Sequence, residues 1–267
     1  MDAAEWLGLQ PTHNPHRWFL PVSPGVSTGH RFLFGGSGLG AGIAAMEATS
    51  GRPVVWATAQ YLSFARTGSI MDIDVSLVVE GAKTTQARAV GHVGGTEILT
   101  VNAALGSRDV DVDGTWVTPP VVRPPDECPL RPRSDDVQAI HSRLDQRWAV
   151  PPEGVDFGGH QGHGPGRTVV WTRLPELLEP GAATLSVLGD WVPMGINMAT
   201  GRDDIAGNSL DNTLRVVNAH ATEWYLLEIA IEAVQNGFGH GYQHIWSQDG
   251  VLLAVASQSV LLRRRRE

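Results

Sequence analysis

The pattern of apolar and polar positions divides the chain into two halves of similar organisation. In the first half, residues 53–65, 69–81, 84–94 and 97–106 are rich in β-branched side chains, alternate in part, and end at glycine turns. In the second half, residues 208–217, 222–234, 239–247 and 251–262 follow the same order. Such segments are typical of β-strands. We therefore expect four antiparallel strands in each half.

A short apolar run and a helix-like pattern precede the four strands in each half. The first half has "RFLFGGSGLGAGIAAMEAT" at 31–49, and the second has "LSVLGDWVPMGINMAT" at 185–200. The first run stops at Gly35-Gly36 and the second at Gly189-Asp190. The pattern after 35 is small and apolar, and the pattern after 190 is apolar almost all round, which predicts buried helices. Each half should thus contain a strand, a helix and four further strands.

The spacing of the turns indicates an internal repeat. Gly95 corresponds to Gly250, an offset of 155 residues (250 − 95), and the same offset places Gly35 opposite Asp190. Identity between the halves is low, so the repeat is predicted from the order and spacing of elements. A buried helix wrapped by a curled antiparallel sheet is the hotdog fold. We predict an α+β fold, a double hotdog of two tandem repeats.

The predicted domains are an N-terminal hotdog at 1–106, a linker at 107–150 and a C-terminal hotdog at 151–267. The linker begins with a proline-rich, charged segment, and proline cannot continue a sheet because it lacks a backbone donor. The sequence "DDVQAIHSRLDQRWA" at 135–149 predicts a short helix within the linker. Residues 151–166 are rich in glycine and histidine and predict a loop.

Composition and charge narrow the class of protein. The 267 residues carry a net charge of −8, which argues against a general nucleic-acid binder. The single cysteine, Cys128, excludes an internal disulfide framework. The N-terminus does not resemble a secretory signal, and no apolar run has the length of a membrane helix. We expect a cytoplasmic protein without membrane insertion. The arginine-rich ending at 263–266 predicts a solvated tail or a contact for an anion.

Five motifs together resemble one enzyme family. They are "FLFGGSGLGAGIAAM", "GDW", "SLDNTLRV", "EWYLLEIA" and "QDGVLLAVASQSVLLR", in this order over residues 30–106 and 185–263. The set is similar to the type II acyl-CoA thioesterases, double-hotdog enzymes that cleave fatty acyl-CoA to a free acid and CoA. Two positions depart from the family pattern, because Ser37 stands where Gln is usual and Asn212 where His is usual.

The resemblance implies three residues that hold the attacking water. These are an Asp at the start of the second helix, a Ser or Thr two residues before an "LD" aspartate, and a Gln in the last strand. Asp190, Ser209 and Gln258 occupy these positions. An ionised carboxylate can take a proton from water, and the hydroxyl and amide groups can orient it. We expect the helix N-terminus to keep Asp190 ionised at neutral pH.

The residues also suggest how the rest of the site is built. Backbone N–H groups at Gly35, Gly36 and Ser37 open a helix and are expected to bind the thioester oxygen or a phosphate. Trp191, directly after Asp190, is expected to narrow the acyl pocket. No metal and no cofactor is required for this chemistry, so we expect neither.

Each of the three residues also has a structural interpretation. Asp190 can serve as a helix N-cap, worth about 1 kcal/mol, and Ser209 as a hydroxyl at a strand edge. Gln258 lies between apolar neighbours, where an unpaired amide costs a few kcal/mol, so a specific partner is expected. Asp211, on the same strand face as Ser209, is expected to support it.

Two other functions remain open at the level of sequence. One is a non-catalytic acyl-CoA-binding protein. The other is a hotdog enoyl-CoA hydratase or dehydratase, which needs a histidine near the helix start, where only His30 is available. The partner expected in each case is an acyl-CoA. Because an open sheet edge favours pairing, we also expect a homodimer or higher homo-oligomer.

Overall fold

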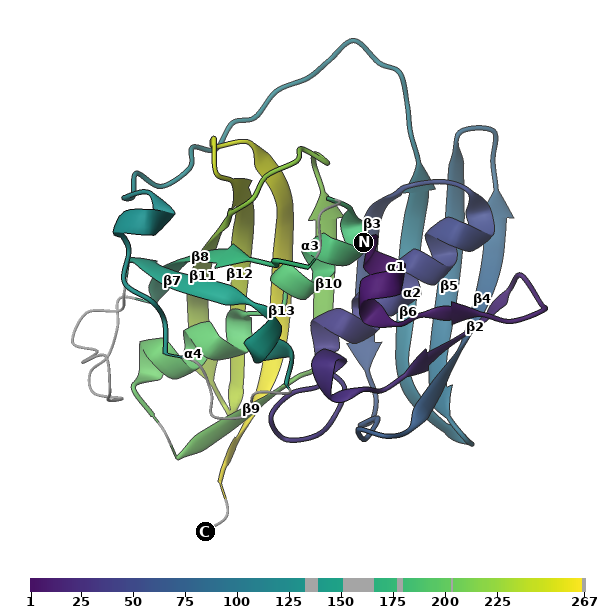
Figure 1. The fold of residues 1–267 in the computed structure, drawn as a ribbon, viewed down its shortest axis with the longest axis horizontal. Coiled ribbons are helices and arrows are strands. Elements are labelled where there is room, and N and C mark those ends of the chain that lie inside the picture. The colour runs from purple at the N-terminus through teal and green to yellow at the C-terminus, as the bar shows by residue number, and fades with distance from the viewer. Residues whose placement is uncertain (133–138, 151–165, 177–179, 203, 266–267) are drawn as a thin grey trace.

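The strands of the protein form one antiparallel sheet. The structure, a computed structural model, describes residues 1–132, 139–150, 166–176, 180–202 and 204–265. The strand order is β1-β2-β4-β5-β6-β3-β10-β13-β12-β11-β8-β7, and β9 pairs with β13 outside this order. Figure 1 shows the first half of the chain, purple to blue, beside the second half, teal to yellow, each with helices packed against its strands.

The elements have the following bounds. The first half contains β1 (Gln10–Pro11), β2 (Arg17–Pro21), β3 (Val54–Tyr61), β4 (Ile70–Glu80), β5 (Thr84–Val93) and β6 (Thr96–Gly106). The second half contains β7 (Asp145–Val150), β8 (Arg167–Arg173), β9 (Ile205–Ser209), β10 (Asp211–Val216), β11 (Tyr225–Gln235), β12 (Phe238–Ser247) and β13 (Leu252–Arg264). The helices are α1 (Ala3–Leu7), α2 (Gly35–Ser50), α3 (Ala182–Leu188) and α4 (Val192–Thr200). Single 3₁₀ turns lie at Pro24–Val26, Pro125–Glu127 and Ile140–Arg143.

The strands expected from the alternating pattern are present, and one of them is divided. The segment 208–217 forms β9 and β10, which are separated at Leu210. Asp211 Oδ1 accepts a hydrogen bond of 2.8 Å from the backbone N–H of Ser259 on β13. This side-chain bond takes the place of a backbone bond between strands, so the ladder is interrupted there. The sequence led us to expect Ser209 and Asp211 on one regular strand. In the structure they lie on two different strands, β9 and β10.

The part of the linker nearest the second half belongs to the sheet. The expected short helix at 135–149 is wrong where it can be compared, because this range holds the Ile140–Arg143 turn and most of β7. Gln146 and Trp148 are buried and their neighbours are less so, which is the two-residue period of a strand. Residues 133–138, and residues 151–165 for which the sequence predicts a loop, lie outside the described residues. Residues 107–124 carry no helix or strand and cross between the halves (Figure 1).

The two halves of the sheet have corresponding strand orders and meet at β3 and β10. These strands are antiparallel, and Thr58 pairs with Thr213 at their centre. The two hydroxyl oxygens are 2.7 Å apart, and the residues are separated by 155 positions. The offset that the turns indicated therefore relates residues that face each other where the halves join.

Helix α2 is the longest helix of the described chain and is largely buried. Eleven of its residues are buried, because strands cover one side and α1 and α3 cover another. Glycines allow the close approach to α3: a Cβ atom at Gly36 would lie 2.7 Å from the carbonyl oxygen of Ser186, and one at Gly40 would lie 2.8 Å from Ser186 Oγ. The small residues noted in the sequence thus serve packing between helices as well as packing on the sheet.

The apolar run before Asp190 is a helix, not the expected strand. Residues Ala182–Leu188 form α3 and are all buried. Short apolar runs do not distinguish helix from strand by their period. The carbonyl groups at the end of α3 are bound by amides from the sheet: Leu188 O accepts from Gln243 Nε2 at 2.5 Å, and Gly189 O accepts from Asn212 Nδ2 at 3.3 Å. These bonds fix the chain directly before Asp190.

Helix α4 is less buried than its apolar sequence predicts. Only Val192, Gly195 and Ile196 are buried, and they pack on the sheet. Pro193, Met194, Asn197 and Met198 line a cavity instead. The apolar residues on that side are explained by a pocket wall. None of the helices in the described ranges has the length and hydrophobicity needed to cross a membrane.

Candidate active site

Asp190 lies between α3 and α4 and is buried, with 6% of its surface exposed. Its Oδ2 atom accepts a hydrogen bond of 2.6 Å from the backbone N–H of Gly36, in the first turn of α2. Its Oδ1 atom accepts a hydrogen bond from Gln258 Nε2. Asp190 therefore caps a helix, but the helix is α2 of the other half and not α4, which follows it in the chain.

Gln258 connects the three residues that the sequence brought forward. Besides the bond to Asp190, its Nε2 atom donates to Ser209 Oγ at 3.2 Å. Its Oε1 atom accepts from the backbone N–H of Val192 at 3.1 Å and so caps α4. The expectation that this buried amide has specific partners is confirmed. The structure brings Asp190, Ser209 and Gln258 into one hydrogen-bonded group. Asp190 and Ser209 line the cavity, and Gln258 lies behind them and joins them.

The protonation state of Asp190 differs from the expectation. Burial raises the pKa of its carboxyl group to about 7, although hydrogen bonds from Gln258 and Gly36 oppose the rise. The helix N-terminus alone led us to expect full ionisation at neutral pH, but the loss of water around the carboxylate has the larger effect. A carboxylate with this pKa can both accept and return a proton near pH 7.

The three residues expected to bind the thioester oxygen are placed differently from one another. Gly35 lines the cavity, whereas Gly36 and Ser37 do not. The N–H of Gly36 already donates to Asp190, and the Ser37 side chain is fully buried without a hydrogen-bond partner in the described chain. Of these three residues, Gly35 is the one that a substrate in the cavity can reach.

Tyr61 is a candidate site residue that the sequence analysis did not identify. A Cβ atom at Gly35 would lie 2.7 Å from Asp190 Oδ2 and 2.9 Å from the Tyr61 hydroxyl oxygen, so both groups flank the same glycine. Burial, followed by the charges of Asp190 and Asp211, holds the pKa of Tyr61 well above its usual value, so the phenol stays protonated. The available signal was its position in β3, on the same face as the buried Ala57 and Ala59.

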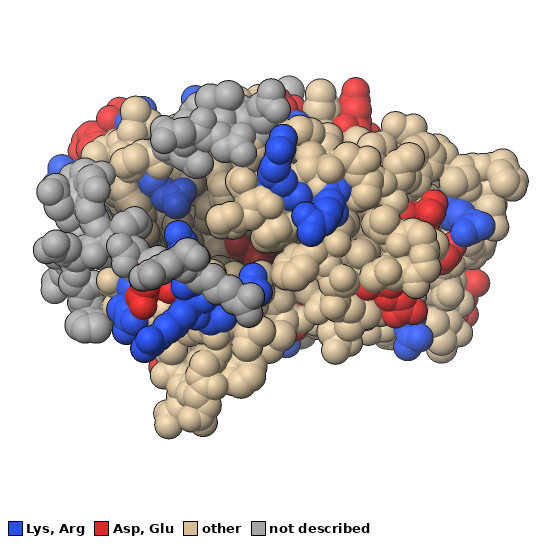
Figure 2. Space-filling model, turned by 90° about the horizontal axis from the view of Figure 1, so that it is seen from below, with Lys and Arg blue, Asp and Glu red and all other residues tan. Residues whose placement is uncertain are grey.

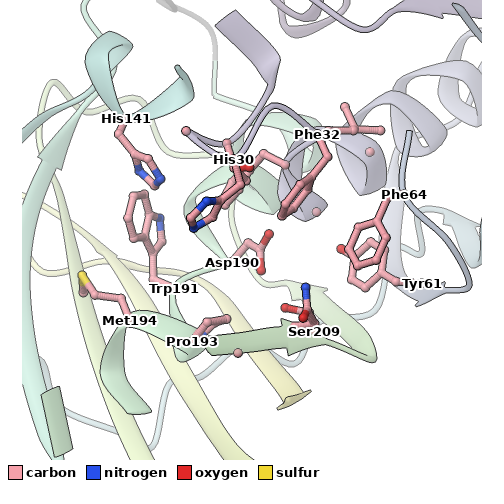
Figure 3. A pocket seen from close by; sticks show the side chains of 18 of the residues that line it. His30, Phe32, Tyr61, Phe64, His141, Asp190, Trp191, Pro193, Met194 and Ser209 are labelled. Carbon is pink, nitrogen blue, oxygen red and sulfur yellow. The ribbon is translucent and has the colours of Figure 1, made fainter. Parts of the chain in front are cut away.

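The cavity at this site has a volume of about 790 Å³. Figure 3 shows Trp191 and His141 on one side of Asp190, and Tyr61, Phe64 and Ser209 on the other. Trp191 packs against Phe34 and His141, with ring centroids 6.0 and 5.4 Å apart. Trp191 thus lines the cavity, and that it narrows a pocket for the acyl group stays a prediction. The surface seen from below is hollowed, and Lys or Arg side chains border the hollow (Figure 2).

Arg263 shows that the arginine-rich end is partly built into the fold. It lies in β13 and lines the cavity. Arg264 also belongs to β13. The strand therefore includes the first two residues of the segment that was expected to be a solvated tail. The structure describes the chain to residue 265, and Arg266 lies outside the described residues.

Comparison with solved structures identifies the fold class of the protein. A protein from Novosphingobium aromaticivorans with a provisional thioesterase name is 33% identical, covering 96% of this chain and 98% of its own, with a TM-score of 0.85. A hot dog fold protein of unknown function from Alicyclobacillus acidocaldarius is 17% identical, covering 99% and 98%, with a TM-score of 0.86. Acyl-CoA thioesterase II from Mycobacterium marinum is 18% identical, covering 98% of both chains, with a TM-score of 0.75. The fold is thus of the hotdog class.

The family is shown by its sequence model. Residues 125–262 match the model of the acyl-CoA thioesterase C-terminal domain. No curated protein is similar enough in sequence to count as a match. The chain belongs to the acyl-CoA thioesterase family, as the five motifs indicated.

Proposed function

We propose that the protein hydrolyses acyl-CoA thioesters by means of a water molecule held by Asp190, Ser209 and Gln258. The observation that carries this proposal is the Gln258 amide, which joins the Ser209 hydroxyl to the buried Asp190 carboxylate. Because Ser209 Oγ accepts from Gln258, its own O–H remains available to a water or a thioester oxygen. The family supports the reaction type, and the hydrogen-bonded group supports the assignment of residues.

The steps of the reaction follow from these roles. Asp190 takes a proton from the water as the oxygen attacks the thioester carbon. The carbonyl oxygen becomes negatively charged, and we assign the protonated Tyr61 hydroxyl and the N-terminus of α2 at Gly35 to its stabilisation. The tetrahedral intermediate then expels the CoA thiolate. The proton held by Asp190 passes to the sulfur, and the free acid leaves.

We also propose that the chain is two tandem hotdog units. The corresponding strand orders and the pairing of Thr58 with Thr213 support this arrangement. Each unit then contributes one central helix, α2 or α4, and the site lies where the two helix starts meet. We further expect pairing of whole molecules into a homodimer, which light scattering would measure as twice the mass of one chain.

The test is thiol release from a panel of acyl-CoAs by the wild type and Asp190→Asn. Loss of a general base lowers the rate by about 10²–10⁴, so we expect a fall of this size. Asn retains an oxygen that can accept from Gly36, so the variant should fold, and its thermal unfolding provides the control. Unchanged turnover by Asp190→Asn would contradict the assigned role.

The other functions give different results in the same experiments. A non-catalytic acyl-CoA-binding protein would gain thermal stability from acyl-CoA but release no thiol from any substrate. A hydratase would add water to an enoyl-CoA. His30 lines the cavity, so this second assay is included. Either outcome, together with no thiol release, would replace the proposed hydrolysis.

A further inference from the structure

The guanidinium group of Arg131 lines the same cavity and has no carboxylate partner among the described residues. Arg131 Nη1 donates to Gln146 Oε1 at 2.5 Å, and the Arg131 backbone N–H donates to Gln146 O at 2.9 Å. The amide of Gln146 is itself held by β8, because its Nε2 atom donates to Thr172 Oγ1 at 3.2 Å. Arg131 is therefore positioned by a rigid neighbour, and that neighbour supplies only one side-chain acceptor.

The positive charge of Arg131 is not balanced within the described residues. The guanidinium is shielded from water although part of the residue reaches the surface, and burial lowers its pKa to about 10, so it remains cationic at neutral pH. Its central carbon lies 5.6 Å from the ring centroid of Trp148 and 5.7 Å from that of Trp191. Aromatic faces attract a cation through the negative charge of their π-systems. They do not replace the hydrogen bonds that the remaining N–H groups lose on leaving water.

Two more polar groups beside Arg131 are buried without a partner. His141 Nδ1 and Trp191 Nε1 have no hydrogen-bond partner in the described chain. Burial, together with the charge of Arg131, lowers the pKa of His141 to about 4, so its ring is neutral at physiological pH. The rings of His141 and Trp191 lie next to each other in Figure 3, with centroids 5.4 Å apart. This part of the cavity thus offers the Trp191 N–H donor beside the Arg131 cation, and His141 Nδ1 is a second donor in the tautomer that carries its proton there.

The location of these donors relates them to the acyl group. Trp191 directly follows Asp190, and Ser209 lies on the other side of that carboxylate (Figure 3). Phe34, Leu144 and Met194 line the cavity as well and supply apolar surface. An acyl chain whose carbonyl group lies at Asp190 can follow this apolar wall toward Arg131.

On the basis of the proposed hydrolysis, we infer that Arg131 binds a carboxylate at the far end of the acyl group. The preferred substrates are then dicarboxylyl-CoA esters, in which one carboxyl group forms the thioester and the other is free. A planar guanidinium matches a carboxylate with two parallel hydrogen bonds. An acyl chain that ends in a methyl group leaves the cation unpaired, and binding sites built for a polar group reject such analogues strongly.

The experiment compares matched substrates in the wild type and Arg131→Met. The substrates are dicarboxylyl-CoAs of four to eight carbons and the unsubstituted acyl-CoAs of the same lengths. For the best length we expect the wild type to prefer the dicarboxylyl ester at least tenfold in kcat/KM. Arg131→Met should remove this preference and change the rate with the unsubstituted ester by less than threefold.

The matched control is Arg147→Met. Arg147 also lies over a tryptophan, 5.9 Å from the Trp224 ring centroid, and donates to the backbone oxygen of Cys128 at 2.9 Å. It is not among the residues that line the cavity. Arg147→Met should therefore keep the wild-type preference. An equal loss of preference in both variants would show a general effect of removing a stacked arginine and would overturn the inference.

Other outcomes separate this inference from the proposed function. If Arg131→Met slows both kinds of ester equally, Arg131 contacts the CoA part and the inference is wrong. If no ester is hydrolysed but adipate raises the Tm of the wild type more than hexanoate, and more than in Arg131→Lys, the inference holds and the proposed hydrolysis fails. The wild-type measurement with the two free acids needs no variant. Equal shifts with both acids would also overturn the inference.

Discussion

At the scale of residues, the unusual pKa of Asp190 determines how activity should depend on pH. Burial raises this pKa to about 7, and only the ionised form takes a proton from water. We expect kcat/KM to fall about tenfold for each pH unit below 7 and to level off above it. Because the hydrogen bond from Gln258 lowers the pKa, Gln258→Met should move the midpoint to higher pH. A profile that is flat between pH 5.5 and 8 would contradict a role for Asp190 as the base.

The same ionisation should appear in the free energy of unfolding. The pKa of an Asp in an unfolded chain is about 3.9, below the value of about 7 in the folded protein. Between these values the folded state holds more protons, so stability falls as pH rises from 4 to 7. In Asp190→Asn this contribution is absent. Urea unfolding of both proteins at pH 5 and pH 7.5 should therefore show the variant gaining relative stability at the higher pH.

The comparison of the two proteins isolates Asp190, because every other titratable group is present in both. Burial also raises the pKa of Glu47, but this group is present in both proteins and cancels in the comparison. Equal pH dependence of wild type and variant would mean that Asp190 is ionised at a normal pKa in the folded protein.

The sequence predicted the members of the site better than their arrangement. Asp190, Ser209 and Gln258 were named from motifs, and they form one group. The hydrogen bond from Gly36 to Asp190 joins two residues 154 positions apart in the chain, so no local sequence pattern predicts it. The environment of Arg131 depends likewise on side chains from three segments. Burial of a charge is a property of the assembled fold, so its pKa could not be read from neighbours in sequence.

At the scale of elements, the contact between α2 and α3 should be sensitive to single atoms. Gly40→Ala would place a Cβ atom 2.8 Å from Ser186 Oγ and 3.0 Å from the carbonyl oxygen of Ala183. Although Ala favours helices, we expect a loss of about 1–3 kcal/mol because the contact is overpacked. Ala48→Ser on the exposed side of the same helix is the control. Denaturant unfolding measures both, and equal stability of the two variants would refute the packing argument.

The prediction of helices and strands succeeded for long elements with a clear two-residue period. It failed for short elements, in which no period could be recognised. The strands β4, β5, β6 and β12 alternate over ten or eleven residues, and each was expected within a few residues of its bounds. The seven residues of α3 are apolar throughout, so no period separates helix from strand. The six residues of β7 follow a proline-rich segment, and their alternation was taken for part of a helix.

At the scale of the whole molecule, the exposed connection between the halves should be dispensable once the chain has folded. Val112 and Trp116 are 75% and 88% exposed, in a segment without strands. Asp190 of the second half binds Gly36 of the first, and β3 pairs with β10. We expect a protease site inserted between residues 112 and 116, cut after folding, to leave activity within twofold of the uncut protein. Each half expressed alone should be inactive, because neither contains the complete site.

The close approach of Gly35 and Asp190 has a consequence for stoichiometry. The 155-residue offset predicted from the sequence relates these two positions, and a Cβ atom at Gly35 would lie 2.7 Å from the carboxylate of Asp190. A second aspartate cannot enter where the first one already fills the space. If the chain is two tandem hotdog units, as proposed, the two units share one reaction centre, and a tight-binding substrate analogue should saturate the protein at one molecule per chain.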